Sequence, residues 1–287
     1  MSTDPNKGPY LLGRTNRLEL LRLVSIGAYL EWSDEAGILL PKRYLPEGAA
    51  VGDTIEAFVY HDNEGRLIAT TLSPLIEVGQ VACLECVSVG QAGAFVEWGI
   101  HRDLFIPYAE GAARMREGYS YPIYAYIDQV SGKIVGSAKL SKHIGTTMPR
   151  HKPGQEVEAL VVERNDVGYR VVVEDQHWGI LYEDECPLPP HRGAKLSAYV
   201  VRLREDGKLD LSLRPVGYQK MNSETTKLLR LLRQHGGSLP IGDKSPAEDI
   251  YRLTGMSKKV FKMAVGALYK EAKLKRPQPH SIELSDL

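Results

Sequence analysis

The 287-residue chain contains 36 basic and 36 acidic residues, so its whole-chain charge points to no particular partner. It is longer than a typical single domain, and its composition is that of an ordinary globular protein, which disfavours a fibrous or disordered chain. No segment approaches the ~18 consecutive apolar residues of a membrane helix, and the N-terminal sequence MSTDPNKGPY lacks the apolar core of a signal peptide. Cysteines 83, 86 and 186 fit a reducing compartment. We therefore expect a cytoplasmic protein with no membrane partner.

Three similar β-rich units follow a polar lead-in over residues 1–15. We place them at residues 16–74, 75–145 and 152–215. In each unit, short apolar segments with a period of two residues alternate with turns that contain glycine or aspartate. The repeat of about sixty residues is long enough for each unit to close its own barrel. The sequence therefore predicts a mainly β fold with three tandem five-stranded barrels.

The period becomes helical after the third unit. Leucines at 228, 231 and 232 share one stripe and predict a helix over residues 224–234, capped by Asn222 or Ser223. The sequence SPAE at residues 245–248 resembles a capping box that opens a second, short helix ending at Gly255. A third helix is expected from Ser257 to about residue 271.

Apolar residues on both sides of Pro277 and Pro279 then predict a hairpin over residues 274–284. This order of elements indicates a winged helix-turn-helix domain at residues 220–287.

Charge is distributed unevenly along the chain. Residues 1–216 hold 23 basic and 29 acidic side chains, whereas residues 217–287 hold 13 basic and 7 acidic ones. A local excess of basic residues is typical of a surface that binds nucleic acid, although it also occurs on merely solvated surfaces.

Candidate binding residues in the barrels are aromatic side chains next to basic ones. Single-stranded nucleic acid is bound by aromatic rings that stack on bases and by cations that contact phosphates. The second barrel offers the fullest set, and the first and third offer less. The candidate RNA-binding residues of the second barrel are Phe95, Phe105, Tyr124, Tyr126, Lys133 and Lys139. The alternative is that one of these aromatic faces is the core of the barrel.

A second candidate surface lies on the third predicted helix. At about 100° per residue, apolar side chains from Val260 to Leu268 form one arc, and Gly266 lies on the opposite arc among lysines. A glycine there allows close approach of a phosphate backbone. The predicted phosphate contacts of the winged helix are Lys259, Lys262, Lys270, Lys273, Lys275 and Arg276. A solvated lysine face is the alternative.

Catalysis and metal binding find no support in the sequence. There is no phosphate-binding loop, no zinc-protease motif, no nucleophile elbow and no spaced cluster of carboxylates and histidines. Cys83 and Cys86 have C-x-x-C spacing, but they lie in an alternating strand and have no second pair. We therefore expect no catalytic residue, no metal and no cofactor.

The barrels resemble the S-one RNA-binding domain, a variety of OB fold. The whole chain is similar to the conserved virulence factor B family of bacterial proteins, also called YitL-like, from about residue 12 to residue 283. The segments that carry this resemblance are 39–44 (LLPKRY), 176–179 (QHWG), 204–213 (REDGKLDLSL), 256–259 (MSKK) and 266–270 (GALYK). The resemblance implies a cytoplasmic, non-enzymatic RNA-binding protein that influences gene expression.

The barrels depart from the S-one pattern at specific positions. Ile26 and Ala92 stand where S-one domains usually carry a first aromatic residue, and Arg170 takes the place of the second aromatic in the third barrel. The second aromatic is kept as Tyr29 and Phe95, and the basic residue after the last turn is kept as Arg66, Lys133 and Lys208. The resemblance therefore adds Tyr29, Arg66 and Lys208 to the candidate RNA-binding residues. These departures reduce the capacity for base stacking, most clearly in the third barrel.

The sequence thus favours a regulator of bacterial gene expression that binds single-stranded RNA without chemistry. The main alternative is a DNA-binding transcription regulator that uses the winged helix on duplex DNA, with the barrels as an interaction scaffold. A third reading is a protein that binds RNA only within a larger ribosome or nuclease assembly.

Overall fold

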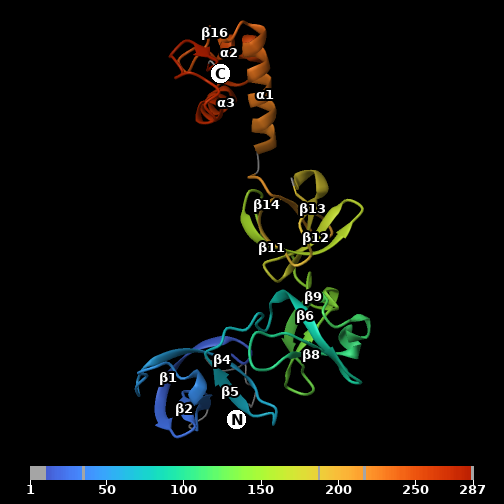
Figure 1. Cartoon of the computed structure of the whole chain (residues 1–287). Coiled ribbons are helices and arrows are strands. Elements are labelled where there is room, and N and C mark those ends of the chain that lie inside the picture. The colour runs from blue at the N-terminus through green and yellow to red at the C-terminus, as the bar shows by residue number, and fades with distance from the viewer. Residues whose placement is uncertain (1–10, 34–35, 187, 216–217, 286–287) are drawn as a thin grey trace. The chain divides into compact units, whose positions relative to one another are not determined.

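The computed structural model describes residues 11–33, 36–186, 188–215 and 218–285. The chain folds as two compact units that divide between Leu213 and Arg214 (Figure 1). The first unit contains three five-stranded barrels, and the second contains three helices and a small sheet. The predicted fold class is therefore confirmed. The finer domain limits given above remain a proposal.

The first barrel shows how the alternating sequence closes a core. Its strands are β1 (Thr15–Val24), β2 (Gly27–Leu30), β3 (Ile38–Pro41), β4 (Thr54–His61) and β5 (Leu67–Thr70). In β1, Leu18 and Leu20 are buried while Arg17 and Glu19 are exposed, as the period of two residues requires. A parallel pairing of β3 with β5 closes the ring.

The second barrel repeats this arrangement with one difference. Its strands are β6 (Val81–Val89), β7 (Gly93–Val96), β8 (Leu104–Pro107), β9 (Ser120–Ile127) and β10 (Ile134–Ser137), hydrogen-bonded in the order β10-β9-β6-β7-β8. No β8–β10 ladder closes this sheet among the described residues. β10 instead packs closely against β8 through side chains. The closeness is seen at Gly136 of β10, where an added Cβ atom would lie only 2.3 Å from Cδ1 of Ile106 on β8.

The third barrel is closed like the first. Its strands are β11 (Glu156–Asn165), β12 (Gly168–Val173), β13 (His177–Tyr182), β14 (Lys195–Leu203) and β15 (Leu209–Ser212), with a parallel β13–β15 pair.

The second strand of each barrel begins with a glycine, at a point where its backbone lies close to the backbone of the third strand. A Cβ atom on Gly27 would lie 2.0 Å from Leu40 O, and one on Gly168 would lie 2.3 Å from Leu181 O. Both glycines also have positive φ, at 151° and 148° respectively, which other residues rarely adopt. The repeated glycine therefore lets neighbouring strands of each barrel approach closely.

The barrels of the first unit are joined by direct contacts. Trp98 of the second barrel packs edge-on against Phe58 of the first, at 5.5 Å between ring centroids, and donates its Nε1–H to Ile76 O at 2.8 Å. Between the second and third barrels, the Val81 N–H donates to Asp175 Oδ1 at 2.7 Å.

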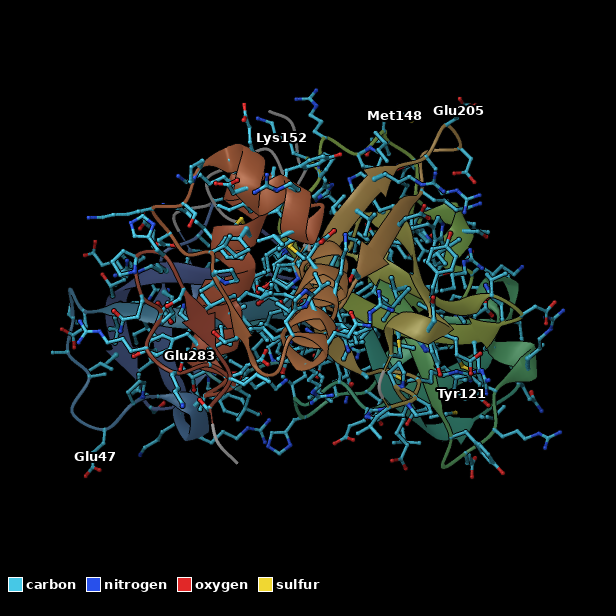
Figure 2. All side chains as sticks on the ribbon, turned by 90° about the horizontal axis from the view of Figure 1, so that it is seen from above. Glu47, Tyr121, Met148, Lys152, Glu205 and Glu283 are labelled. Atoms are coloured by element: carbon cyan, nitrogen blue, oxygen red, sulfur yellow. The ribbon has the colours of Figure 1, made fainter. Side chains whose placement is uncertain are left out.

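Side chains with nitrogen and oxygen tips surround the ribbon, with Glu47 and Glu205 at loop tips (Figure 2).

The C-terminal unit has the elements of a winged helix. They are α1 (Tyr218–Gln234), β16 (Ser238–Leu239), α2 (Ala247–Thr254), α3 (Lys258–Lys270) and β17 (Ile282–Glu283). β16 pairs antiparallel with β17, and a bridge from Leu274 to Leu284 marks the predicted hairpin. None of the helices among these described residues combines the length and apolarity needed to cross a membrane.

Two predictions about the helix starts were wrong. The first helix begins at Tyr218, so neither Asn222 nor Ser223 caps it. α2 has Pro246 at its N-cap with no side-chain cap hydrogen bond, because the Ser245 hydroxyl accepts from the Gly242 N–H at 2.9 Å instead. The predicted cap of α3 is confirmed, since Ser257 Oγ accepts from the Val260 N–H at 3.4 Å.

Candidate nucleic-acid interface

The outer face of the second barrel presents two neighbouring aromatic rings. Phe95 on β7 and Phe105 on β8 are opposite each other in the antiparallel register, with ring centroids 5.2 Å apart. Ala94 and Val96 point into the core, so alternation turns Phe95 outward, where it is 37% exposed. The two rings offer an apolar platform at the surface.

A cleft of about 530 Å³ adjoins this platform and includes residues of the first barrel. Lys133, which follows the β9–β10 turn, lines the cleft and is exposed, with no ion pair among the described residues. Arg102 is held by hydrogen bonds from its Nη1 to the carbonyl oxygens of His61, at 2.7 Å, and of Asp62. The cleft thus combines a ring pair with two cations that have no ion pair among the described residues, and of these Arg102 is occupied by backbone carbonyl oxygens.

Asp128 and His61 also line this cleft. The Ser131 backbone N–H and hydroxyl both donate to Asp128 Oδ1 at 2.8 Å, which lowers the pKa of that carboxyl group. Burial lowers the pKa of His61, and the nearby Arg102 lowers it further. Asp128 is therefore a charged turn residue near neutral pH, and His61 is neutral there.

Tyr124 and Tyr126 share one face of β9, but a histidine covers that face. The His143 ring stacks on Tyr124 at 4.5 Å between centroids and lies 4.7 Å from Tyr126. Burial raises the pKa of Tyr124 and lowers that of His143. A nucleobase could stack on either tyrosine here only by displacing His143, and RNA binding by these two residues stays a prediction.

In the first and third barrels, the candidate residues are engaged within the chain. The Arg22 guanidinium lies over the Tyr29 ring at 4.0 Å. Arg66 pairs with Asp62 at 2.7 Å and with Glu64 at 2.8 Å. Lys208 pairs with Asp206 at 2.8 Å. These side chains are therefore less available for phosphates or bases than Lys133.

The basic face of α3 is exposed opposite its buried side. Phe261, Ala264, Val265 and Leu268 are buried, and an added Cβ on Gly266 would meet no atom within 4 Å. The exposed basic residues on or after the helix are Lys259, Lys262, Lys270, Lys273, Lys275 and Arg276.

Carboxylates lie near some of these cations. Lys262 lies 3.9 Å from Asp243, Lys273 lies 2.7 Å from Glu271, and Lys275 lies 3.7 Å from Glu283. Lys259, Lys270 and Arg276 have no ion pair among the described residues, so the helix itself carries the more available charge.

No group of three or more His, Cys, Asp or Glu residues suited to a metal ion occurs in the part of the chain that the structure describes. Cys86 is buried, and Cys83 and Cys186 are partly buried.

Sequence reasoning missed two residues at these surfaces, Arg102 and His143. Both residues lie outside the strands, so the two-residue period gave neither of them a role. A search for charged or aromatic residues inside turns next to aromatic strands would have found both.

Three family models match the chain. An S1 domain model matches residues 12–72, the model for the second domain of the virulence regulatory factor CvfB matches residues 142–215, and the CvfB-like winged helix model matches residues 226–284. Two of these models are CvfB models, and the chain therefore resembles the conserved virulence factor B family.

Relatives agree with this assignment. The chain is 26% identical over 257 residues to the uncharacterized protein YitL of Bacillus subtilis, covering 86% of this chain and 85% of the relative. It is 25% identical over 228 residues to conserved virulence factor B of Staphylococcus saprophyticus, covering 77% and 76%.

The chain also matches a crystal structure of a multidomain protein with nucleic acid binding domains from Streptococcus pneumoniae. The match covers 96% of this chain and 98% of that chain, at 23% identity and a TM-score of 0.40.

Proposed function

We propose that this chain is a cytoplasmic, non-enzymatic protein that binds single-stranded RNA and regulates bacterial gene expression. The observation that carries the proposal is the ring pair of exposed Phe95 and half-buried Phe105 beside Lys133. Rings at the surface of an OB-type barrel stack on bases, and a nearby cation contacts phosphate. The S1 domain match supports this assignment, and relatives named as virulence factors support a regulatory role.

Binding to three nucleic acids tests the proposal. Purified protein is titrated into labelled single-stranded RNA, single-stranded DNA of the same sequence and duplex DNA, each at two salt concentrations. We expect the tightest binding to the RNA, with duplex DNA weakest, because paired bases cannot lie flat on the Phe95 ring. A clear preference for duplex DNA would contradict the proposal.

The absence of catalysis is tested separately. RNA incubated with the protein and Mg²⁺ or Mn²⁺ should remain intact over hours. RNA cleavage that co-purifies with the protein and disappears in Asp128→Asn would show that the chain is an enzyme.

A DNA-binding regulator is the second candidate, and the surface of α3 favours it. Lys259 and Lys270 flank an exposed Gly266, so a phosphate backbone could approach the helix closely. In this case a triple change of Lys259, Lys262 and Lys270 to Gln should abolish duplex binding and leave binding to single-stranded RNA nearly intact.

A further inference from the structure

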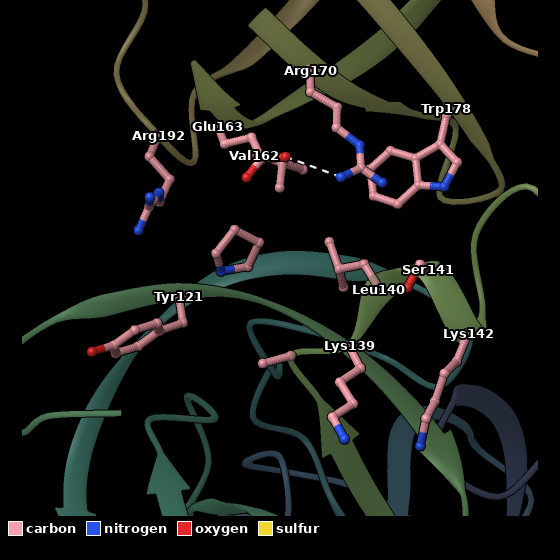
Figure 3. Close-up of a pocket in the computed structure, with 12 residues that line it drawn as sticks. Tyr121, Lys139, Leu140, Ser141, Lys142, Val162, Glu163, Arg170, Trp178 and Arg192 are labelled. Atoms are coloured by element: carbon pink, nitrogen blue, oxygen red, sulfur yellow. Dashed lines mark hydrogen bonds and ion pairs between the residues drawn. The ribbon is translucent and has the colours of Figure 1, made fainter. Parts of the chain in front are cut away.

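A second cleft, of about 480 Å³, opens between the second and third barrels inside the first unit. Figure 3 shows side chains of both barrels facing this space. Its polar and aromatic lining comes from Tyr121, Lys139 and Lys142 on one side and from Glu163, Arg170, Trp178 and Arg192 on the other.

The two walls of this cleft are held together. The Gly145 N–H, just after the second barrel, donates to Gln176 O of the third barrel at 2.8 Å. Leu140 and Ile144 are buried in one cluster with Val172 and Trp178. A site between these walls would therefore be largely formed before a ligand arrives.

The charge of the lining is mainly positive. It contains four cations and one carboxylate, Glu163. Two of the cations are engaged, because Lys142 pairs with Glu110 and Arg170 pairs with Glu163 at 3.0 Å. Lys139 and Arg192 are exposed and have no ion pair among the described residues. The cleft therefore brings two available cations together from different barrels, in a unit whose sequence has an excess of acidic residues.

Arg170 adds a flat surface to the cleft. It stands two residues after the glycine that opens β12, as Phe95 does in β7. Its guanidinium lies 3.6 Å from the centroid of the Trp178 ring, and the ion pair with Glu163, its register partner on β11, fixes its direction. A guanidinium plane can stack under a base as an aromatic ring does. Arg170 can thus serve the third barrel where the other barrels have an aromatic ring.

The two clefts are close enough for one strand. Lys133 and Lys139 flank β10, and at ~3.3 Å per residue they are separated by at most roughly 20 Å. OB-type domains bind about 4–16 nucleotides each, so a strand of that length can reach both places.

We propose that the cleft between the second and third barrels binds the continuation of a single-stranded RNA whose bases stack on Phe95. Lys139 and Arg192 contact its phosphates, and Arg170 lies beneath one base. This inference rests on the proposed RNA binding and extends it to a site that spans two barrels.

The test compares the full-length protein with two double variants. Lys139→Gln with Arg192→Gln removes one lysine and one arginine from the cleft. Arg150→Gln with Lys152→Gln removes the same charges from exposed residues that do not line it. Each protein is titrated with a labelled 20-nucleotide single-stranded RNA over a range of salt, and its thermal melting is recorded.

The cleft variant should have a slope of log affinity against log salt that is flatter by about 1.4, since each phosphate contact on a single strand contributes about 0.7. If the two proteins bind RNA equally at 1 M salt, this change of slope makes the affinity of the cleft variant about 25-fold weaker at 0.1 M salt. The control variant should keep the slope. Arg170→Lys should weaken binding about five-fold or more without changing the slope, because it retains the charge and loses the plane.

The outcomes separate this inference from the proposed function. If the wild-type protein does not bind RNA, both fail. If the wild type binds, Phe95→Leu weakens binding, and the cleft variant has the wild-type slope and affinity, only the proposal for the cleft is overturned. If polyglutamate binds the wild type as tightly as RNA and loses the same factor in the cleft variant, the cleft is a general polyanion site and its assignment to RNA is wrong.

Discussion

Replacing Phe95 by leucine should weaken RNA binding and leave the fold nearly unchanged. Leucine keeps most of the apolar contact that Phe95 makes with its strand neighbours but has no ring. Because the side chain is already 37% exposed, we expect a loss of unfolding free energy of about 1 kcal/mol or less. For a unit of this size, that is a fall in melting temperature of about 2–4 °C.

The expected loss of affinity is larger. Stacking of a base on an aromatic ring contributes about 1–3 kcal/mol, which corresponds to roughly a 5- to 150-fold change in the dissociation constant. Fluorescence anisotropy with a labelled single-stranded RNA measures this change at constant salt. The slope against salt should not change, since no cation is removed.

Phe58→Leu is the matched control. Phe58 is only 1% exposed and packs against Trp98 and Tyr60 inside the first unit. Its loss of ring volume should cost about 1–3 kcal/mol of stability and leave the affinity of the folded protein unchanged. If Phe95→Leu instead melts like Phe58→Leu and binds RNA like the wild type, Phe95 is a packing residue and the platform has been misassigned.

Other parts of the molecule give three further predictions. In thermal melting, Gly136→Ala should destabilise the first unit by about 1–3 kcal/mol, because the new Cβ would lie 2.3 Å from Ile106 Cδ1. Gly266→Ala lies on an open helix surface and should stabilise the second unit by up to about 1 kcal/mol. Burial lowers the pKa of His143 below its ordinary value, so the unfolded chain binds a proton that the folded protein does not. Stability should therefore fall as the pH is lowered through about 6.5, and denaturant titrations should show a weaker fall in His143→Gln. Changing three lysines of α3 to Gln should flatten the salt dependence of single-stranded RNA binding by about 2, and an unchanged slope would mean that this face is only solvated. These lysines are Lys259, Lys262 and Lys270.

The alternating pattern of the sequence predicted the barrels correctly for a physical reason, and the structure decides the direction of Phe95, which the sequence left open. Side chains on a strand alternate between two faces, so the burial of Ala94 and Val96 determines where Phe95 points. The same pattern could not say what covers a face. Tyr124 and Tyr126 do share one side of β9, but His143, which lies in a separate segment of the chain, packs on both rings.

Local signals failed where tertiary contacts decide. α1 starts before its apparent cap residues, and the serine of the SPAE segment bonds to Gly242 rather than to its own helix. β16 has only two residues, Ser238 and Leu239, and exists because β17 pairs with it. No period can be read from so short a segment. The cleft with Arg170 and Arg192 depends on the contact between two barrels, which repeat analysis treats as independent.

The packing between the first two barrels has a consequence for synthesis on the ribosome. Phe58 and Tyr60 of the first barrel share one continuous core with Trp98 and Ile134 of the second. At about 5–20 residues per second, the roughly sixty residues that follow the first barrel take some 3–12 s to emerge. During that interval Phe58 and Tyr60 have no side chain of the second barrel to pack against. The nascent chain therefore passes through a stage in which this apolar surface is exposed to solvent.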